Sequence, residues 1–381
     1  MTIYLDNAAT SWPKPEPVYR GMDTFARDSA ANAGRSSHAM ARASEKILLD
    51  ARVALNRMFA GASPDRWAFT LNGTDALNMA IKGALVAGDH VVTTDLEHNS
   101  VSRPLRALEL GGSISVTRIA SDAGGTVDPD AVARALTPTT KLVVVTHASN
   151  VLGTVQPIED IARIAHESGA LVLVDAAQSA GILRVRLDET PIDLLAFPGH
   201  KALMGPTGTG ALYVGPRARI RAWREGGTGG DSTSETQPTD YPHVLEGGTP
   251  NVMGISGLLA GLRWIGEQGI ERLHERENAL ARRLSEAIAE LPGLRLLGHQ
   301  DWSKKVATVS FTCEGLAPHE LGSVLDASFA IALRSGLHCA PHIHGAQGSF
   351  PDGAVRASFG PFNTDADVDA LVDALAEILR G

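Results

Sequence analysis

The stretch Leu194-Leu195-Ala196-Phe197-Pro198-Gly199-His200-Lys201 joins an apolar run to a lysine that follows it closely. Apolar runs of the same kind occupy residues 91–94, 142–145, 171–174 and 211–214. Runs without polar alternation are typical of strands that are covered on both faces, as in a parallel sheet. Amphipathic, helix-like segments lie between these runs. The pattern therefore predicts βαβ units in a doubly wound α/β sheet, which binds ligands beyond the carboxyl ends of its strands.

The chain has 381 residues, which at roughly 150 residues per domain suggests about two domains. We expect a large α/β domain over residues 15–255, with a mainly parallel sheet. A smaller α+β domain is expected over residues 256–381, together with the N-terminal segment 1–14. The segment 226–248 is rich in Gly, Ser and Thr and has no hydrophobic period, so it predicts a flexible or functional loop.

Composition excludes several classes of protein. The formal net charge is −9 at pH 7, which argues against a broad basic surface for nucleic acid. Cys313 and Cys339 are the only cysteines, too few for a secreted disulfide framework. The first residues resemble no export signal, and no apolar run approaches the roughly 18 residues of a membrane span. We expect a soluble, cytoplasmic protein that binds neither nucleic acid nor membrane.

Two candidate functional residues follow predicted strands directly. Partial burial of Lys201 would lower its proton affinity and make it nucleophilic toward an aldehyde, although a surface lysine beside a turn is the alternative. Asp175 follows the run 171–174 and could pair with a protonated ring nitrogen, with Gln178 reaching the same ligand. A helix N-cap is the alternative for Asp175.

Two further candidates lie earlier in the chain. His98 follows the run 91–94 and could stack on a flat ligand or shuttle a proton, or it could be a structural histidine. Gly73 and Thr74 open a predicted helix, and a helix N-terminus offers N–H groups to a phosphate. Any helix can begin in this way, so Gly73 and Thr74 alone indicate a phosphate site only weakly.

The late segment Arg334-Ser335-Gly336-Leu337-His338-Cys339-Ala340-Pro341 holds one of the two cysteines. Beside Arg334 and His338, Cys339 could be held as a reactive thiolate. An inert thiol is one alternative, and a metal site is another, although its spacing matches no common zinc motif. The histidines that could join such a site are His338, His342 and His344. Arg356 could clamp a carboxylate with its planar guanidinium, or it could pair with an acid or cap a helix.

Taken in order along the chain, these motifs resemble those of class V, fold-type I pyridoxal-phosphate (PLP) enzymes. The resemblance is specifically to the group II cysteine desulfurases and selenocysteine-lyase-like proteins, and it spans almost the whole length. The segments that carry it are Tyr4-Leu5-Asp6-Asn7-Ala8-Ala9-Thr10, Glu97-His98, Ser149-Asn150-Val151-Leu152-Gly153-Thr154, Asp175-Ala176-Ala177-Gln178, Gly199-His200-Lys201, Gly248-Thr249-Pro250-Asn251, residues 334–340 and Val355-Arg356-Ala357-Ser358.

The resemblance implies a fold-type I PLP-dependent transferase and a role for each matching residue. Lys201 would bind the cofactor aldehyde covalently and, once released, move the substrate's α-proton. Asp175 would keep the pyridine nitrogen protonated, so that the ring acts as an electron sink. His98 and Cys339 complete the implied catalytic set. The implied cofactor contacts are Thr74, Asp75, His98, Asn150, Asp175, Gln178, His200, Lys201 and Thr249. The implied substrate contacts are Asn7, Asn150, Arg334 and Arg356.

The implied reaction converts L-cysteine to L-alanine and leaves the sulfur on Cys339 as a persulfide, without a metal. Thr249 would reach the cofactor of the neighbouring subunit, which implies a homodimer with shared sites. A sulfur-acceptor protein would take the sulfur on, for uses such as iron–sulfur cluster assembly. A selenocysteine lyase, a class V aminotransferase or epimerase, and a cofactor-binding interaction protein remain alternatives.

One position departs from the family pattern. The family usually has Ser or Thr two residues before the histidine of the lysine motif, whereas this chain has Pro198. Proline supplies neither a hydroxyl nor an N–H group. The departure therefore predicts weaker retention of the cofactor.

Overall fold

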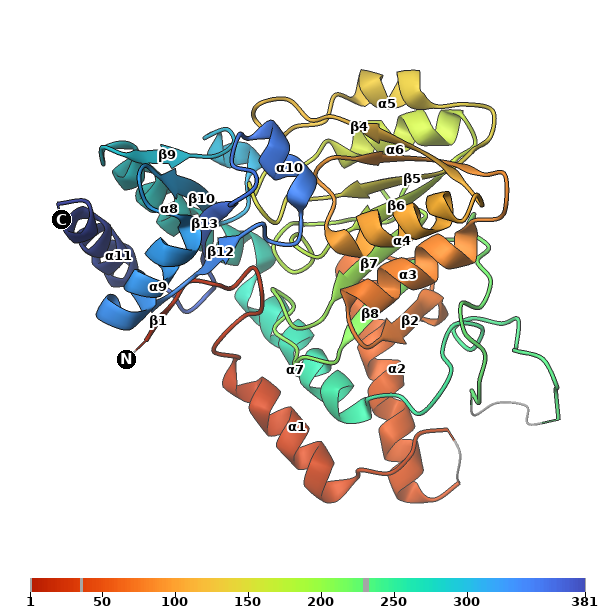
Figure 1. Cartoon of the computed structure of the whole chain (residues 1–381). Coiled ribbons are helices and arrows are strands. Elements are labelled where there is room, and N and C mark those ends of the chain that lie inside the picture. Colours follow the sequence, from red (N-terminus) through yellow and green to blue (C-terminus); the bar gives the residue numbers. More distant parts are fainter. Residues whose placement is uncertain (1, 35–36, 229–232, 381) are drawn as a thin grey trace.

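The computed structural model describes residues 2–34, 37–228 and 233–380, so residues 229–232 of the expected glycine-rich loop lie outside the described part (Figure 1). The largest sheet has the strand order β2-β8-β7-β6-β5-β3-β4. Its strands are β2 (Trp67–Thr70), β3 (His90–Thr94), β4 (Ser115–Ile119), β5 (Thr140–Thr146), β6 (Leu171–Asp175), β7 (Leu194–Pro198) and β8 (Gly210–Val214). All neighbours from β7 to β4 pair in parallel, and β8 is antiparallel to both of its neighbours. The predicted α/β class with a mainly parallel sheet is confirmed.

Alternate residues of the central strands enter two different apolar cores. Val143 and Val145 of β5 pack in one core, whereas Leu142 and Val144 pack in the other. The first core includes side chains of α2 (Ala39–Phe59), α5 (Pro129–Ala135), α6 (Ile158–Glu167) and α7 (Val252–Gln268). The second includes those of α3 (Gly73–Ala84) and α4 (Asn99–Leu110). Because both faces of the sheet are covered, its strands have near-continuous apolar sequence.

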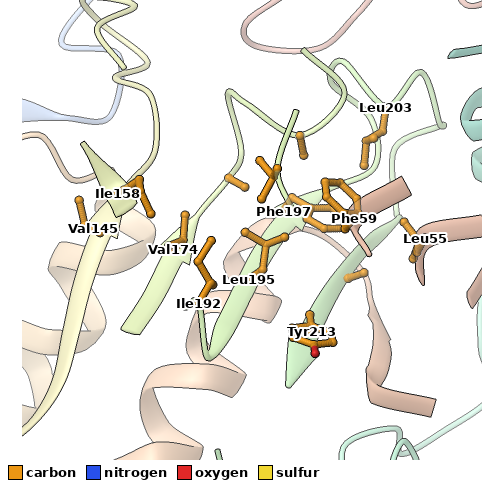
Figure 2. Close-up of a cluster of buried hydrophobic side chains, with 14 of the residues drawn as sticks. Leu55, Phe59, Val145, Ile158, Val174, Ile192, Leu195, Phe197, Leu203 and Tyr213 are labelled. Carbon is orange, nitrogen blue, oxygen red and sulfur yellow. The ribbon is translucent and has the colours of Figure 1, made fainter. Parts of the chain in front are cut away.

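Figure 2 shows part of the first core, where Phe59 of α2 lies against Phe197 of β7. The centroids of these two rings are 5.2 Å apart. Phe197 ends the apolar part of β7 and is fully buried. Its packing fixes the end of the strand from which the loop that carries Lys201 emerges.

A second sheet has the strand order β12-β13-β10-β9. Its strands are β9 (Leu294–Leu296), β10 (Thr308–Cys313), β12 (Arg334–Gly336) and β13 (Ala354–Ser358), and the helices of this region are α8 (Ile270–Ala289), α9 (Pro318–Phe329), α10 (Pro341–Ala346) and α11 (Asp365–Ile378). β13 and β10 are the two central strands of this sheet. The C-terminal helix α11 begins with a capping contact, in which the Asp367 carboxylate accepts the Thr364 N–H at 2.9 Å.

The N-terminal segment contacts both parts of the chain. β1 (Ile3–Tyr4) pairs in parallel with β11 (Ile331–Ala332), while the Ser11 hydroxyl donates to the Lys201 carbonyl. α1 (Glu16–Asp28) follows and lies against α7 (Figure 1). The domain division at residues 255/256 stays a prediction, and it would fall inside α7. None of the helices in the described ranges is long and apolar enough to cross a membrane.

Candidate active site

A cavity of about 210 Å³ lies at the carboxyl ends of the central parallel strands, and residues of β12 and β13 close it. It brings together most of the residues that the sequence singles out. Those lining it are Thr74, His98, Asn150, Asp175, Gln178, His200, Lys201, Arg334 and Arg356. Parallel strands end at one edge of a sheet, which explains how residues far apart in sequence meet here.

Lys201 lies in the loop after β7, where its side chain is partly accessible from the cavity. Burial, with a smaller effect of Arg356 and Arg334, lowers the pKa of Lys201 from 10.5 to about 8, against the opposing effect of Asp175. The Ser11 hydroxyl and the Met204 N–H both donate to the Lys201 carbonyl, at 2.7 and 2.9 Å. The structure therefore holds the lysine backbone firmly and makes its amine a better nucleophile than a surface lysine.

Asp175 ends β6 and is buried. One carboxylate oxygen, Oδ1, accepts the Ala177 N–H at 2.9 Å. Burial raises the pKa of Asp175, while the Ala177 N–H and the Lys201 charge lower it. The helix N-cap alternative is wrong, because a turn follows Asp175. A buried carboxylate that faces a cavity with one strong hydrogen bond can pair with a cationic N–H group of a ligand.

Glu97 lies close to Asp175 and is a residue for which the sequence motifs predicted no role. It is fully buried, and its Oε1 accepts the Thr94 hydroxyl at 2.8 Å and the Thr146 N–H at 2.9 Å. Burial raises the pKa of Glu97 to about 8, so the group is mostly neutral at pH 7. The signal that could have found it is its place, as an acid directly before His98 and shortly after an apolar run.

His98 caps the N-terminus of α4, and its Nδ1 accepts the Ser100 N–H at 3.0 Å. Burial and nearby cationic side chains lower the pKa of His98 to about 4, so its ring is neutral and carries its proton on Nε2. The Ser100 hydroxyl also lies 2.7 Å from that of Thr74. His98 thus has a structural capping role and lines the cavity as a flat, uncharged ring.

The end of the cavity near α3 has the features of a phosphate site. Gly73 and Thr74 begin α3, and His200 lies beside them with its Nδ1 buried and without a partner. Pro198 packs tightly here, because a Cβ added to Gly73 would lie 3.0 Å from its Cδ. Helix N-termini favour anions through their free N–H groups.

Arg356 and Arg334 lie directly opposite each other on β13 and β12. Arg356 is completely buried, and its Nη2 donates to Asp6 Oδ1 at 2.7 Å while its Nη1 donates to the Asn150 carbonyl at 2.8 Å. Its Nε is buried and has no hydrogen-bond partner. The ion-pairing alternative for Arg356 is therefore correct, and the free Nε still leaves a donor for a ligand. Asp6 lies 350 positions away in the chain, and no sequence signal connected it with Arg356.

Cys339 does not line the cavity itself, but Arg334, which does, donates through Nη2 to the Cys339 Sγ at 3.3 Å. His338 and Cys339 both adopt positive φ angles, of 50° and 58°. Asn150 Nδ2 donates to the His338 carbonyl at 2.6 Å, and the Asn99 N–H donates to the Cys339 carbonyl at 2.7 Å. These contacts hold a backbone conformation that non-glycine residues rarely adopt.

Besides Cys339, three expected site residues do not line this cavity. The Asp75 N–H is already bound to Asn72 Oδ1 at 2.8 Å. Asn7 lines a smaller neighbouring cavity, and its amide donates to the Ser358 carbonyl and to Asn363. Thr249 lines a separate cavity of about 590 Å³.

The metal alternative for Cys339 finds no support in the structure. His344 Nδ1 is bound to the Ser349 hydroxyl at 2.8 Å, and the ring of His344 stacks on that of His338. Over residues 2–34, 37–228 and 233–380, no group of three His, Cys, Asp or Glu side chains could hold a metal ion.

The donor set of the cavity fits PLP. An amine of lowered pKa suits an aldehyde, a buried carboxylate suits a pyridinium N–H, and a helix N-terminus with an unpartnered histidine nitrogen suits a phosphate. The architecture is that of a fold-type I PLP enzyme. It matches the apo structure of cysteine desulfurase from Thermococcus onnurineus NA1 with a TM-score of 0.94 and 34% identity, covering 100% of this chain and 95% of the other. The cysteine desulfurase CsdA from Escherichia coli matches with a TM-score of 0.89 and 31% identity, over 100% and 95% of the two chains.

The chain belongs to the class-V aminotransferase family, whose model matches residues 3–371. Its curated relatives include a probable cysteine desulfurase from Methanothermobacter thermautotrophicus, which is 36% identical over 99% of this chain and 94% of the relative. A probable cysteine desulfurase from Halalkalibacterium halodurans is 33% identical over 98% and 92%. The resemblance inferred from the sequence motifs is thus confirmed.

Proposed function

We propose that this protein is a PLP-dependent cysteine desulfurase that converts L-cysteine to L-alanine and accepts the sulfur on Cys339. The observation that supports it most strongly is the hydrogen bond that the Cys339 sulfur accepts from Arg334, because Arg334 lines the same cavity as Lys201 and Asp175. Relatives that are named probable cysteine desulfurases match nearly the whole chain.

PLP would be held by Lys201 and Asp175, with His98 and Gln178 beside its ring and Thr74 and His200 at its phosphate. When bound, it supplies a ring that withdraws electrons from the substrate's α-carbon. Lys201 then holds and moves the proton at that carbon, a task that suits an amine whose pKa lies near 8. Arg356 holds the substrate carboxylate, with Arg334 on the opposite strand.

The Cys339 thiolate attacks the sulfur of the bound L-cysteine. The new S–S bond forms as the substrate's C–S bond breaks, and the electron pair of that bond stays on the substrate carbon. That carbon takes up a proton and becomes the methyl group of L-alanine, while Cys339 is left as a persulfide. The thiol is fixed beside the site, so the attack avoids a bimolecular encounter.

We also propose a homodimer in which Thr249 reaches the cofactor of a second copy. Thr249 lines a cavity away from Lys201 that the exposed apolar side chains of Leu49 and Leu71 also line, which supports a contact between copies. Mixing Lys201→Ala and Thr249→Ala subunits should restore part of the activity that each variant lacks alone. Mixed samples no more active than their components would contradict shared sites.

We further place the protein in the cytoplasm, with an acceptor protein that takes the sulfur from Cys339 for uses such as iron–sulfur cluster assembly. The large and small domains proposed for this chain would meet at the active-site cavity. Persulfide transfer from labelled Cys339 to a candidate acceptor would test the acceptor directly.

Alanine release from L-cysteine by the purified, PLP-loaded protein tests the function. Cys339→Ala should abolish persulfide formation and keep the cofactor absorption, whereas the matched variant Cys313→Ala should keep both. Lys201→Ala should lose covalent cofactor attachment after borohydride reduction. Full turnover by Cys339→Ala would instead favour the aminotransferase or epimerase alternative. A kcat/KM for L-selenocysteine far above that for L-cysteine would favour the lyase.

A further inference from the structure

Asp6 forms the only ion pair of either arginine in the cavity, as far as the described residues show. The Arg356 side chain is 1% exposed and the Asp6 side chain is 21% exposed. Burial lowers the pKa of Arg356, and the charge and hydrogen bond of Asp6 oppose that effect. A buried cation without a partner is costly, so Asp6 has a direct influence on how Arg356 is held.

The position of Asp6 is fixed by the backbone. The Leu5 N–H donates to the Ala332 carbonyl, and the Ser358 N–H donates to the Leu5 carbonyl. Asp6 itself forms an isolated parallel bridge with Ser358, two residues beyond Arg356. These contacts fix the backbone from which the Asp6 carboxylate reaches the guanidinium.

The hydrogen bonds of Arg356 leave one nitrogen for a ligand. Nη2 is bound to Asp6 and Nη1 to the Asn150 carbonyl, whereas Nε is buried without a partner. An unpaired buried donor costs about 1–3 kcal/mol, which an incoming oxygen would recover. Asp6 and Asn150 thus bind the two terminal nitrogens of the guanidinium, and Nε is the nitrogen that remains able to donate to a ligand.

Charge gives a second consequence. Arg334 and Arg356 lie opposite each other in the β12–β13 ladder, and both line the cavity. Asp6 offsets one of these two positive charges, so the pair as a whole keeps one. A single net positive charge matches an amino acid that has one carboxylate and an uncharged side chain.

We propose that Asp6 is a positioning and specificity-determining residue, which orients Arg356 and restricts the site to amino acids with one carboxylate. Without the Asp6 charge, a second acidic group on the substrate would meet an uncompensated arginine. The inference rests on the proposed function, since it deepens the role given there to Arg356.

The test measures ligand binding to the PLP-loaded protein through changes in cofactor absorption. L-Alanine serves as the probe with one carboxylate and L-aspartate as the probe with two. Neither contains sulfur, so binding can be measured whether or not the protein desulfurates cysteine. Asp6→Asn keeps an acceptor oxygen but removes the charge, and Asp6→Ala removes both. Asp130→Asn, an exposed site on α5, is the control for a change in net charge.

We expect the affinity of Asp6→Asn for L-alanine to stay within threefold of that of the wild type. Its affinity for L-aspartate should be at least tenfold higher than that of the wild type. Asp6→Ala should weaken L-alanine binding at least tenfold, because Arg356 loses its anchor. Asp130→Asn should change neither affinity. An unchanged preference between the two ligands in Asp6→Asn would overturn the specificity role, and unchanged L-alanine binding in a folded Asp6→Ala would overturn the positioning role. If Asp6→Ala does not fold, the preference of Asp6→Asn between L-alanine and L-aspartate decides whether the proposal stands.

Discussion

Replacing Lys201 with methionine should stabilise the cofactor-free protein, although it removes the central amine of the site. The pKa of Lys201 is about 8 in the folded protein, whereas in the unfolded chain it has the usual lysine value of 10.5. The unfolded chain therefore binds this proton more tightly, and charging Lys201 destabilises the fold at pH 7. At 1.36 kcal/mol for each pH unit, the cost is about 3 kcal/mol. This is an upper bound, because the side chain is partly accessible from the cavity.

The melting temperature measures this effect. The unfolding entropy of a chain of this length is about 0.8 kcal/mol/K, so about 3 kcal/mol corresponds to a rise in Tm of about 4 °C. The difference should shrink as the pH rises from 8 to 10.5, where wild-type Lys201 becomes neutral in both states. Lys141→Met, at an exposed site in β5, should leave Tm almost unchanged. A Lys201→Met rise no larger than this control, or a rise that is equal at pH 7 and pH 10, would refute the reasoning.

Three further changes test other parts of the molecule. Pro198→Ser adds a hydroxyl and an N–H at the proposed phosphate site, and a hydrogen bond to a charged group contributes about 1.5–3 kcal/mol. The Kd for PLP in equilibrium dialysis should therefore fall at least tenfold, and Pro216→Ser, at an exposed turn, should not change it. Burial raises the pKa of Glu277 from 4.5 to about 8. Below pH 4.5 Glu277 is protonated in both the folded and the unfolded state and costs no stability. As the pH rises from 4.5 to 8 the unfolded chain loses this proton first, so the free energy of unfolding falls. Glu277→Gln should match the wild-type Tm near pH 4.5 and exceed it by about 4 °C at pH 7 in thermal scans. Asn150→Ala should slow persulfide formation on Cys339 at least tenfold more than it slows α-proton exchange of L-alanine, and equal losses would deny it a role in placing the thiol.

The parts of the site that could be predicted from sequence lie just after apolar runs. Lys201 follows β7 and Asp175 ends β6, its parallel neighbour, so their meeting at the edge of the sheet is a consequence of the fold. The contacts of Arg356 could not be predicted, because its two partners lie 206 and 350 positions away in the chain. Neither apolar periodicity nor a local motif specifies which carboxylate a buried guanidinium will meet.

The conformation of the Cys339 loop is a second feature beyond local sequence. Gly336 and Pro341 indicate a turn, but they do not indicate that His338 and Cys339 themselves take positive φ. Each such residue costs about 1–2 kcal/mol, so the loop needs contacts from outside to persist. The Asn150 side chain, 188 positions away, and the Asn99 N–H bind the two carbonyls of the strained pair. Asn150 also accepts from Arg356 through its own carbonyl, so one residue joins the proposed carboxylate site to the backbone of the sulfur acceptor. The orientation of the Cys339 thiol therefore depends on Asn150, which also binds Arg356. A substitution of Arg356 should change the position of Cys339, and a change in the Cys339 loop should change how Arg356 is held.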